Sequence, residues 1–150
     1  MGSSCCSCDI SRLRINIIFK TCVMAKNERI PPHYQTVMPY LIINNAEKFL
    51  EFMKNVFDAK EAHKAMRDEH TIMHGEIQLD ECTIMFADST EKYQPRPAGM
   101  FIYVDDADKR FAKAIKAGAT PVTEVADQPY GRSGGVMDPF GNTWWITSAK

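Results

Sequence analysis

The sequence predicts an α+β fold built from two similar halves, each with the order strand, helix, strand, strand, strand. The main observation is a repeat: residues 45–48 read Asn-Ala-Glu-Lys, and residues 106–109 read Asp-Ala-Asp-Lys. Each copy follows an apolar stretch and opens a helical pattern, and strand-like patterns follow each helix. This order differs from the alternation of a doubly wound parallel sheet. It therefore predicts paired modules whose curved mixed sheets surround a cleft, with the helices on their outer faces.

The first half begins with an apolar strand at residues 40–43. Asn45 is a suitable N-cap for the helix that follows, because its side-chain oxygen can accept a free amide of the first turn. Apolar residues recur at helical spacing from Phe49 to Phe57, and the helix is expected to end at 57–59. Strands are predicted at 60–67, 71–79 and 82–87, separated by acidic turns.

The second half follows the same plan after a proline-containing linker at 94–97. An apolar strand at 101–104 precedes a helix capped by Asp106, and Gly118 suits the left-handed position after that helix. Strands are predicted at 120–125, 135–137 and 142–147, and residues 131–135 are interpreted as a glycine-rich loop. Residues 138–142 predict a turn, because Pro139 presets its own φ and Gly141 accepts a positive one.

The N-terminal 1–30 segment differs in composition and is expected to be a disordered or non-native extension, with Met24 as the natural start. The folded part is predicted to be one domain over 34–148, with halves at about 36–88 and 98–148. Four of the five cysteines lie at positions 5, 6, 8 and 22, so Cys82 is the only thiol in the domain. A lone thiol cannot form a disulfide framework, which favours a reducing compartment and predicts a cytoplasmic protein.

Charge and hydropathy exclude two classes of partner. The 150-residue chain has a formal net charge of -1, whereas a nucleic-acid binder is expected to carry a basic stripe. No apolar run approaches the roughly 20 residues that cross a bilayer. The sequence therefore predicts neither nucleic-acid binding nor a transmembrane segment.

Several motifs give the chain a family resemblance. They are, in order, residues 38–41 (Met-Pro-Tyr-Leu), 73–76 (Met-His-Gly-Glu), 103–106 (Tyr-Val-Asp-Asp) and 138–144 (Asp-Pro-Phe-Gly-Asn-Thr-Trp). Together they resemble the glyoxalase / bleomycin-resistance / extradiol-dioxygenase (vicinal oxygen chelate) superfamily, and within it the PhnB-like proteins. The resemblance implies paired βαβββ modules, a small-molecule ligand in the cleft between sheets, and usually a homodimer.

The resemblance also implies where a metal would bind. Metal-dependent members place one ligand on the first and last strand of each half, and these positions correspond to Met38, Met85, Met100 and Trp145. None of these side chains is a ligand that hard divalent ions prefer. No His, Glu, Asp or Gln lies within two residues of Met38, Met85, Met100 or Trp145. We therefore expect no metal and no other cofactor.

Polar residues alternate on the predicted strand 71–79. His74, Glu76 and Gln78 share one face, and Met73, Ile77 and Leu79 share the other. If the apolar set packs on the helix, the polar trio faces the cleft. His74 and Glu76 could then act as an acid–base pair. The alternative is a solvated strand face with a salt bridge between them.

The remaining candidates would line the ligand site. Met38, Tyr40, Met85, Met100 and Trp145 are expected to form an apolar wall, with Trp144 pointing to the opposite face, toward the second helix. Arg132 is a candidate clamp for an anionic group of the ligand, or else a surface loop arginine.

The leading hypothesis is a metal-free, dimeric small-molecule binding protein, with sequestration of a toxic or antibiotic compound as one family-level possibility. The alternatives are a lyase, isomerase or transferase that uses Glu76 and His74, and a metal-dependent glyoxalase-like enzyme.

Overall fold

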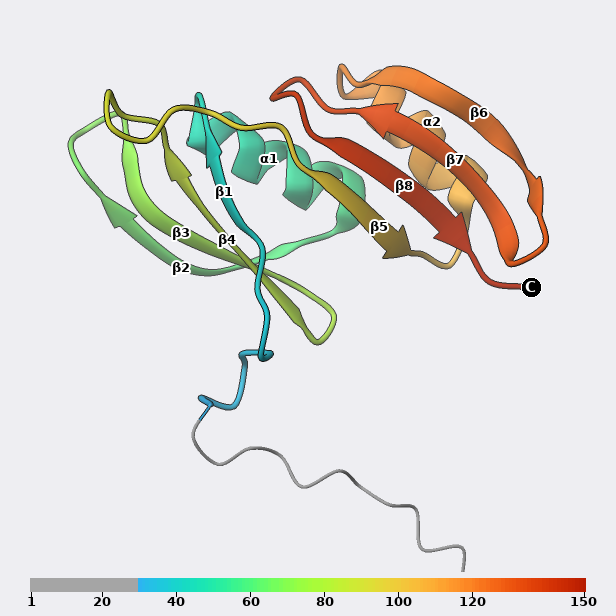
Figure 1. The fold of residues 1–150 in the computed structure, drawn as a ribbon, viewed down its shortest axis with the longest axis horizontal. Coiled ribbons are helices and arrows are strands. Elements are labelled where there is room, and N and C mark those ends of the chain that lie inside the picture. The colour runs from blue at the N-terminus through green and yellow to red at the C-terminus, as the bar shows by residue number, and fades with distance from the viewer. Residues whose placement is uncertain (1–29) are drawn as a thin grey trace, which may run out of the picture.

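The computed structural model describes residues 30–150 (Figure 1). The predicted extension therefore lies outside the described residues, apart from Ile30. The predicted repeat of strand, helix and three strands is confirmed in both halves. The elements of the first half are β1 (Tyr40–Ile43), α1 (Ala46–Phe57), β2 (Lys60–Met66), β3 (Ile72–Leu79) and β4 (Cys82–Asp88), and those of the second are β5 (Gly99–Tyr103), α2 (Ala107–Lys116), β6 (Thr120–Gln128), β7 (Gly131–Met137) and β8 (Thr143–Ser148).

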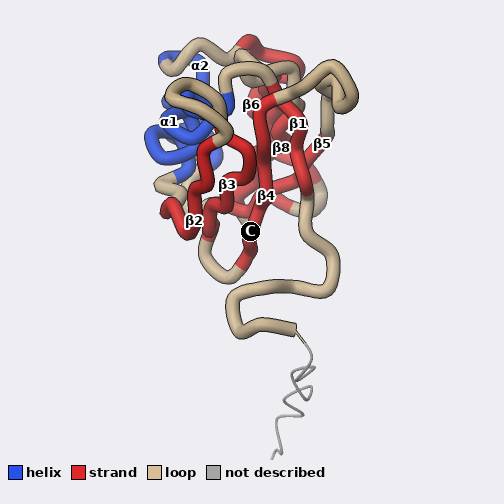
Figure 2. Tube along the Cα trace, turned by 90° about the vertical axis from the view of Figure 1, so that its left-hand side faces the viewer, coloured by secondary structure: helices blue, strands red, loops and turns tan. Residues whose placement is uncertain are grey.

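Each half forms a four-stranded mixed sheet with the same topology. The strand orders are β1-β4-β3-β2 and β5-β8-β7-β6, with the first pair parallel and the other two pairs antiparallel in each sheet. Figure 2 shows both helices on one side of the strands. Each sheet therefore has one face covered by helix and one helix-free face, and the two sheets lie side by side (Figure 1).

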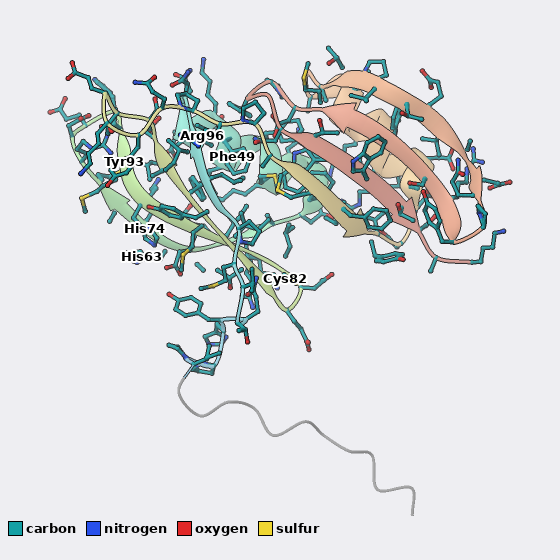
Figure 3. All side chains as sticks on the ribbon, in the orientation of Figure 1. Phe49, His63, His74, Cys82, Tyr93 and Arg96 are labelled. Carbon is teal, nitrogen blue, oxygen red and sulfur yellow. The ribbon has the colours of Figure 1, made fainter. Side chains whose placement is uncertain are left out.

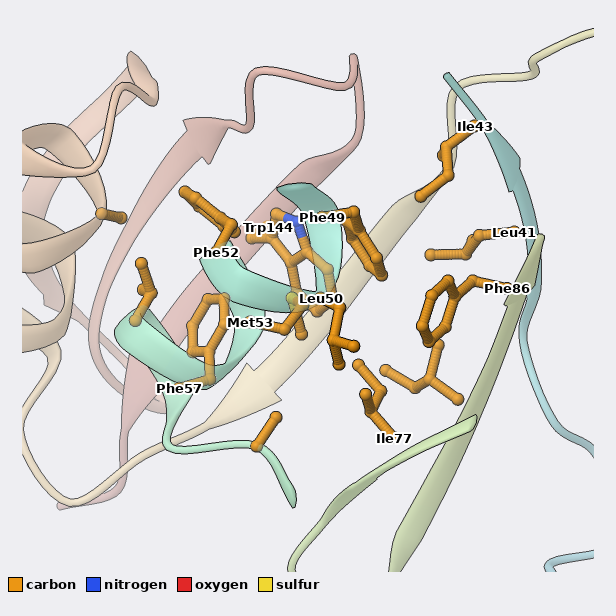
Figure 4. Close-up of a cluster of buried hydrophobic side chains, with 14 of the residues drawn as sticks. Leu41, Ile43, Phe49, Leu50, Phe52, Met53, Phe57, Ile77, Phe86 and Trp144 are labelled. Atoms are coloured by element: carbon orange, nitrogen blue, oxygen red, sulfur yellow. The ribbon is translucent and has the colours of Figure 1, made fainter. Parts of the chain in front are cut away.

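Helix α1 packs against both halves of the molecule. Its buried residues Phe49, Leu50 and Met53 point toward the first sheet and toward Trp144 of β8 (Figure 4). The ring of Phe57 lies 5.0 Å from that of Trp144, and the ring of Phe49 lies 5.5 Å from that of Phe140. Burying these aromatic surfaces stabilises the junction, and the edge-to-face geometry of the Phe49–Phe140 pair adds to this.

The start of α1 differs from the sequence prediction. Asn45 adopts a left-handed conformation and its side chain caps nothing. Instead the buried carboxylate of Asp88 accepts hydrogen bonds from Ala46 N at 2.9 Å and from Ile72 N at 2.7 Å. A cap supplied by a distant strand cannot be found from local spacing. In the second half the prediction is confirmed, because Asp106 accepts from Lys109 N at 3.0 Å and Gly118 has φ 99°.

Residues 131–135 form the first part of strand β7, so their interpretation as a glycine-rich loop is wrong. The glycines are needed because other side chains lie close to the strand. A Cβ on Gly135 would lie 2.6 Å from Trp145 Cζ3, and one on Gly134 would lie 2.7 Å from Val125 Cγ2. Glycine inside a strand commonly marks such an approach.

Strand β3 contains an irregularity that alters one predicted face. The register with β2 shifts between the pairs Ala65↔His74 and Met66↔Ile72. Ile72 and Ile77 are fully buried toward α1, whereas Met73 is 52% exposed. The prediction that Met73 packs on the helix with Ile77 is therefore wrong, because a β-bulge shifts the alternation by one residue.

Candidate functional site

Polar side chains gather on the helix-free face of the first sheet. We call this the polar face and define it by His63, His74, Glu76 and Gln78. The register places Glu76 between His63 of β2 and Met85 of β4, so these three side chains share one face. Figure 3 shows His63 and His74 next to each other on strands β2 and β3. The predicted grouping of His74, Glu76 and Gln78 on one face agrees with this arrangement.

Hydrogen bonds connect four residues of this region. His74 Nε2 lies 2.9 Å from Glu76 Oε1, and His74 Nδ1 lies 3.3 Å from the hydroxyl of Tyr40. The hydroxyl of Tyr34 lies 2.9 and 3.0 Å from the two carboxylate oxygens of Glu76. Glu76 is 7% exposed while Tyr40 is 50% exposed, so the network runs from a buried carboxylate to an accessible phenol.

The surroundings of Glu76 keep it ionised. Burial raises the pKa of this carboxyl group. The hydrogen bonds from His74 and Tyr34 outweigh burial and hold the pKa below its usual range. The same bond raises the pKa of Tyr34, because an ionised phenol beside a carboxylate is unfavourable. Glu76 is therefore an acceptor at neutral pH, and Tyr34 is a donor.

Tyr34 was missed by the sequence analysis, because it precedes the first strand and belongs to no repeating pattern. Its position is fixed by the residues on either side. Gln35 Nε2 donates to Thr83 O at 2.7 Å, Thr83 N donates to Gln35 Oε1 at 3.0 Å, and Thr83 Oγ1 donates to His33 O at 2.6 Å. These bonds attach the segment before β1 to strand β4 and bring Tyr34 over Glu76.

A hollow of about 690 Å³ lies over the polar face. Its lining includes His33, Tyr34, His63, His74, Glu76, Gln78 and Thr83. A volume of this size is typical of small-molecule sites, which combine apolar walls with a few placed polar groups. The hollow thus joins the carboxylate, the imidazoles and the amide in one space open to solvent.

None of the predicted apolar-wall residues is among the residues that line this hollow, but two of them lie beside it on the same sheet face. Tyr40 and Met85 are register partners on the helix-free face of the first sheet, and Met38 is half-buried just before β1. Trp145 lies on the helix-free face of the other sheet and is 37% exposed. Met100 pairs with Trp144 and packs against the core, so its predicted place in the same wall as Trp145 is wrong.

Arg132 is also separated from the polar face. Its guanidinium donates to both carboxylate oxygens of Asp108 on α2, with Nη2 to Oδ1 at 2.8 Å, and to Asp127 at 3.2 Å. The side chain therefore lies on the helix side of the second sheet, where two carboxylates already compensate its charge. The prediction that Arg132 joins His74 and Glu76 as an anion clamp is wrong. The one-residue alternation of β7 puts Ser133, not Arg132, on the helix-free face.

The helix-free face of the second sheet carries exposed aromatic residues instead. We define this aromatic face by Phe101, Tyr103, Trp145 and the adjacent Tyr130. Their exposed fractions are 51%, 60%, 37% and 54%. The ring of Phe101 lies 5.3 Å from Tyr103 and 6.1 Å from Tyr130. Contiguous exposed aromatic surface is uncommon on a protein that has no binding partner.

Residues 30–150 contain no group of three His, Cys, Asp or Glu side chains placed to hold a metal ion. Trp145 and the methionines at the family's ligand positions offer no alternative set of hard ligands. The absence of a resident metal stays a prediction. Within the same residues, no helix is long and apolar enough to cross a membrane.

Comparisons with known proteins extend this description. The model of the Glyoxalase/Bleomycin resistance protein/Dioxygenase superfamily matches residues 31–146. An uncharacterized protein of Mycobacterium bovis, Mb0911c, is 30% identical over 118 residues, which cover 71% of this chain and 78% of that protein.

Three solved structures share the fold. TioX from Micromonospora sp. ML1 has a TM-score of 0.65 at 20% identity and covers 77% of this chain and 100% of its own. The PhnB protein from Bacillus cereus has a TM-score of 0.64 at 21% identity, with the same coverage. TnmS3 from Streptomyces sp. CB03234, an antibiotic binding protein, has a TM-score of 0.59 at 14% identity and covers 78% and 100% of the two chains.

Proposed function

Since this chain belongs to the glyoxalase/bleomycin resistance protein/dioxygenase superfamily, we propose that it is a small-molecule binding protein without a resident metal. The ligand occupies the hollow over the polar face. The observation that carries the proposal is the buried, hydrogen-bonded carboxylate of Glu76 at the floor of that hollow. A buried carboxylate that neighbouring side chains keep ionised in a hollow is typical of functional sites, which favours a role in binding.

The ligand is an amphipathic molecule. Tyr40, Met85 and Met38 offer aromatic and thioether surface, and methionine adapts to ligands of irregular shape. His74, Glu76 and Gln78 offer polar groups that fix its orientation. The printed description of TnmS3 as an antibiotic binding protein supports an antibiotic or a comparable toxic compound as the ligand class.

The binding form is a homodimer. Within one chain the two helix-free faces lie side by side, so neither covers the other. A second copy that places its aromatic face over the polar face of the first would bury Phe101, Tyr103 and Trp145 and enclose the hollow. Aromatic residues are enriched in such interfaces, which supports this arrangement. Cys82 is a free thiol, which suits the reducing cytoplasm that we propose as the location.

A metal-free enzyme is the second candidate. His74 and Glu76 are in hydrogen-bond contact at 2.9 Å, and the lowered pKa of Glu76 leaves it ionised and able to accept a proton. In this case Glu76→Gln abolishes turnover. In a binding protein the same change keeps the size and acceptor oxygen of the side chain and leaves affinity within a few-fold.

Native mass spectrometry of the purified chain, combined with metal analysis, tests the proposal. We expect two copies per particle, less than a stoichiometric amount of divalent metal, and a retained small molecule. One equivalent of a divalent metal accompanied by activity would instead establish the metal-dependent glyoxalase-like enzyme. A monomer that retains no small molecule from cell extract or from an antibiotic mixture would contradict the binding role.

A further inference from the structure

The hydrogen bonds around His74 fix which atom holds each proton. Glu76 is ionised and can only accept, so the Nε2 atom of His74 carries a hydrogen and donates it over 2.9 Å. In a neutral His74, the Nδ1 atom then carries a lone pair and no hydrogen. The hydroxyl of Tyr40, 3.3 Å away, must donate to it. The three residues therefore form a directed line in which Tyr40 donates to His74 and His74 donates to Glu76.

This order of donors and acceptors is the one found in acid–histidine–hydroxyl triads. A buried carboxylate holds the imidazole in one tautomer, and the imidazole in turn accepts the proton of a hydroxyl. Here the carboxylate is 7% exposed and the terminal phenol 50% exposed. The rings of Tyr40 and His74 lie 5.7 Å apart, which keeps the pair in contact. The accessible end of the line is therefore the oxygen of Tyr40.

Other tyrosines of the described chain lack this arrangement. Tyr34 donates directly to Glu76, without a histidine between them. Tyr93, Tyr103 and Tyr130 are more exposed than Tyr40, and within residues 30–150 none of their hydroxyls bonds a histidine. Tyr40 is thus the one phenol of the described residues whose proton points at a histidine.

We propose that Tyr40 is the reactive group of this site and exchanges a proton with a bound ligand that carries an acidic hydroxyl of the phenol kind. The ligand O–H bond breaks as Tyr40 Oη takes that proton. The original Tyr40 O–H bond breaks as its proton passes to His74 Nδ1. The ligand stays bound as a phenolate, and the charge of Glu76 balances that of the imidazolium. This inference rests on the proposed binding of a small molecule over the polar face, and it assigns Glu76 a positioning role.

Acetylation by p-nitrophenyl acetate tests how readily Tyr40 gives up its proton. In this reaction a bond forms between Tyr40 Oη and the acetyl carbon, p-nitrophenolate leaves, and the phenol proton passes to His74. The full chain is treated near neutral pH, and the acetylation of each tyrosine is followed by peptide mass spectrometry. We expect Tyr40 to react at least about ten-fold faster than Tyr93 and Tyr130, since an adjacent base activates a hydroxyl.

Variants test whether the acetylation rate of Tyr40 depends on His74 and Glu76 rather than on solvent exposure of the phenol. His74→Gln should reduce the rate at Tyr40 to that of Tyr130. Glu76→Gln should do the same, because its amide can donate to Nε2 and move the imidazole hydrogen to Nδ1. His70→Gln is the matched control, since it removes an exposed imidazole from the loop between β2 and β3, outside the polar face and the hollow, and should leave the rate within about two-fold. A general loss of folding would change all tyrosines together and is thereby recognised.

Two outcomes overturn the inference: equal rates at Tyr40 and Tyr130 in the unaltered chain, or an unchanged rate at Tyr40 in His74→Gln. A retained ligand with an unreactive Tyr40 would defeat this inference alone. A reactive Tyr40 in a chain that retains no small molecule would defeat the proposed binding function but not the activated phenol.

Discussion

The two halves of the molecule share one topology and differ in the chemistry of their helix-free faces. In the first half, β3 places His74, Glu76 and Gln78 on that face. In the second half the corresponding strand, β7, places Ser133 and Gly135 there, and the hydroxyl of Ser133 lies 2.8 Å from that of Thr147. The polar face therefore carries imidazole and carboxylate groups, and the aromatic face offers apolar area. A repeated fold allows this division, since the buried side of each sheet maintains the structure while the other side varies.

The largest expected difference between the two sides of one strand concerns Trp144 and Trp145. Trp144 is 1% exposed and its Nε1 donates to Asp138 at 2.9 Å, whereas Trp145 is 37% exposed. Trp144→Ala should lower the free energy of unfolding by about 4 kcal/mol, because it opens a cavity and removes a buried bond. Trp145→Ala should cost about 1 kcal/mol or less in dilute protein. Urea unfolding followed by circular dichroism measures both, and equal losses would contradict the assignment of faces.

A second pair of substitutions compares glycines on the third strand of each sheet. A Cβ on Gly75 would lie 2.4 Å from Phe86 Cζ, and one on Gly135 would lie 2.6 Å from Trp145 Cζ3. Phe86 is fully buried, but the half-exposed Trp145 can move aside. Gly75→Val should therefore cost about 3 kcal/mol and Gly135→Val about 1 kcal/mol. Urea unfolding measures the loss of stability in both variants. A greater loss for Gly135→Val would show that the aromatic face is as tightly packed as the core.

The fold and the candidate site could be predicted from the sequence only in part. The repeat at 45–48 and 106–109 and the alternation along β3 were sufficient for the fold and for the shared face of His74, Glu76 and Gln78. Met100 was misplaced because a one-residue change in register moves a side chain to the opposite face. The placement of Tyr34 and the capping role of Asp88 depend on contacts between distant segments. Tyr34 and Glu76 are 42 residues apart in the sequence, and so are Ala46 and Asp88. No local pattern records such contacts.

The ionisation of Glu76 gives a third, smaller effect that is specific to the polar face. Its pKa in the folded chain lies below the ordinary value of 4.5. The native state thus favours the charged form, and the resulting stabilisation is complete above that ordinary value and is lost as the pH falls through the folded pKa. Between pH 6 and pH 3, the unaltered chain should lose more stability than Glu76→Gln does. Matched unfolding curves at both pH values test this, and parallel losses would contradict it.

The smallest expected effect concerns Arg132. Its ion pairs with Asp108 and Asp127 are exposed at the surface, and such pairs contribute little to stability. Arg132→Ala should leave the urea midpoint nearly unchanged. It should also leave ligand retention unchanged, because the residue lies on the helix side of the second sheet. A clear loss of ligand in this variant would restore Arg132 as an anion clamp.

The most direct measurement of the central claim is ligand retention by native mass spectrometry after incubation with a mixture of amphipathic antibiotics that includes bleomycin. The unaltered chain and Arg132→Ala should both carry an adduct. The double variant His74→Ala, Glu76→Ala should lose it while remaining folded by circular dichroism. An adduct retained equally by the double variant would place the binding site elsewhere and contradict the assignment of the polar face.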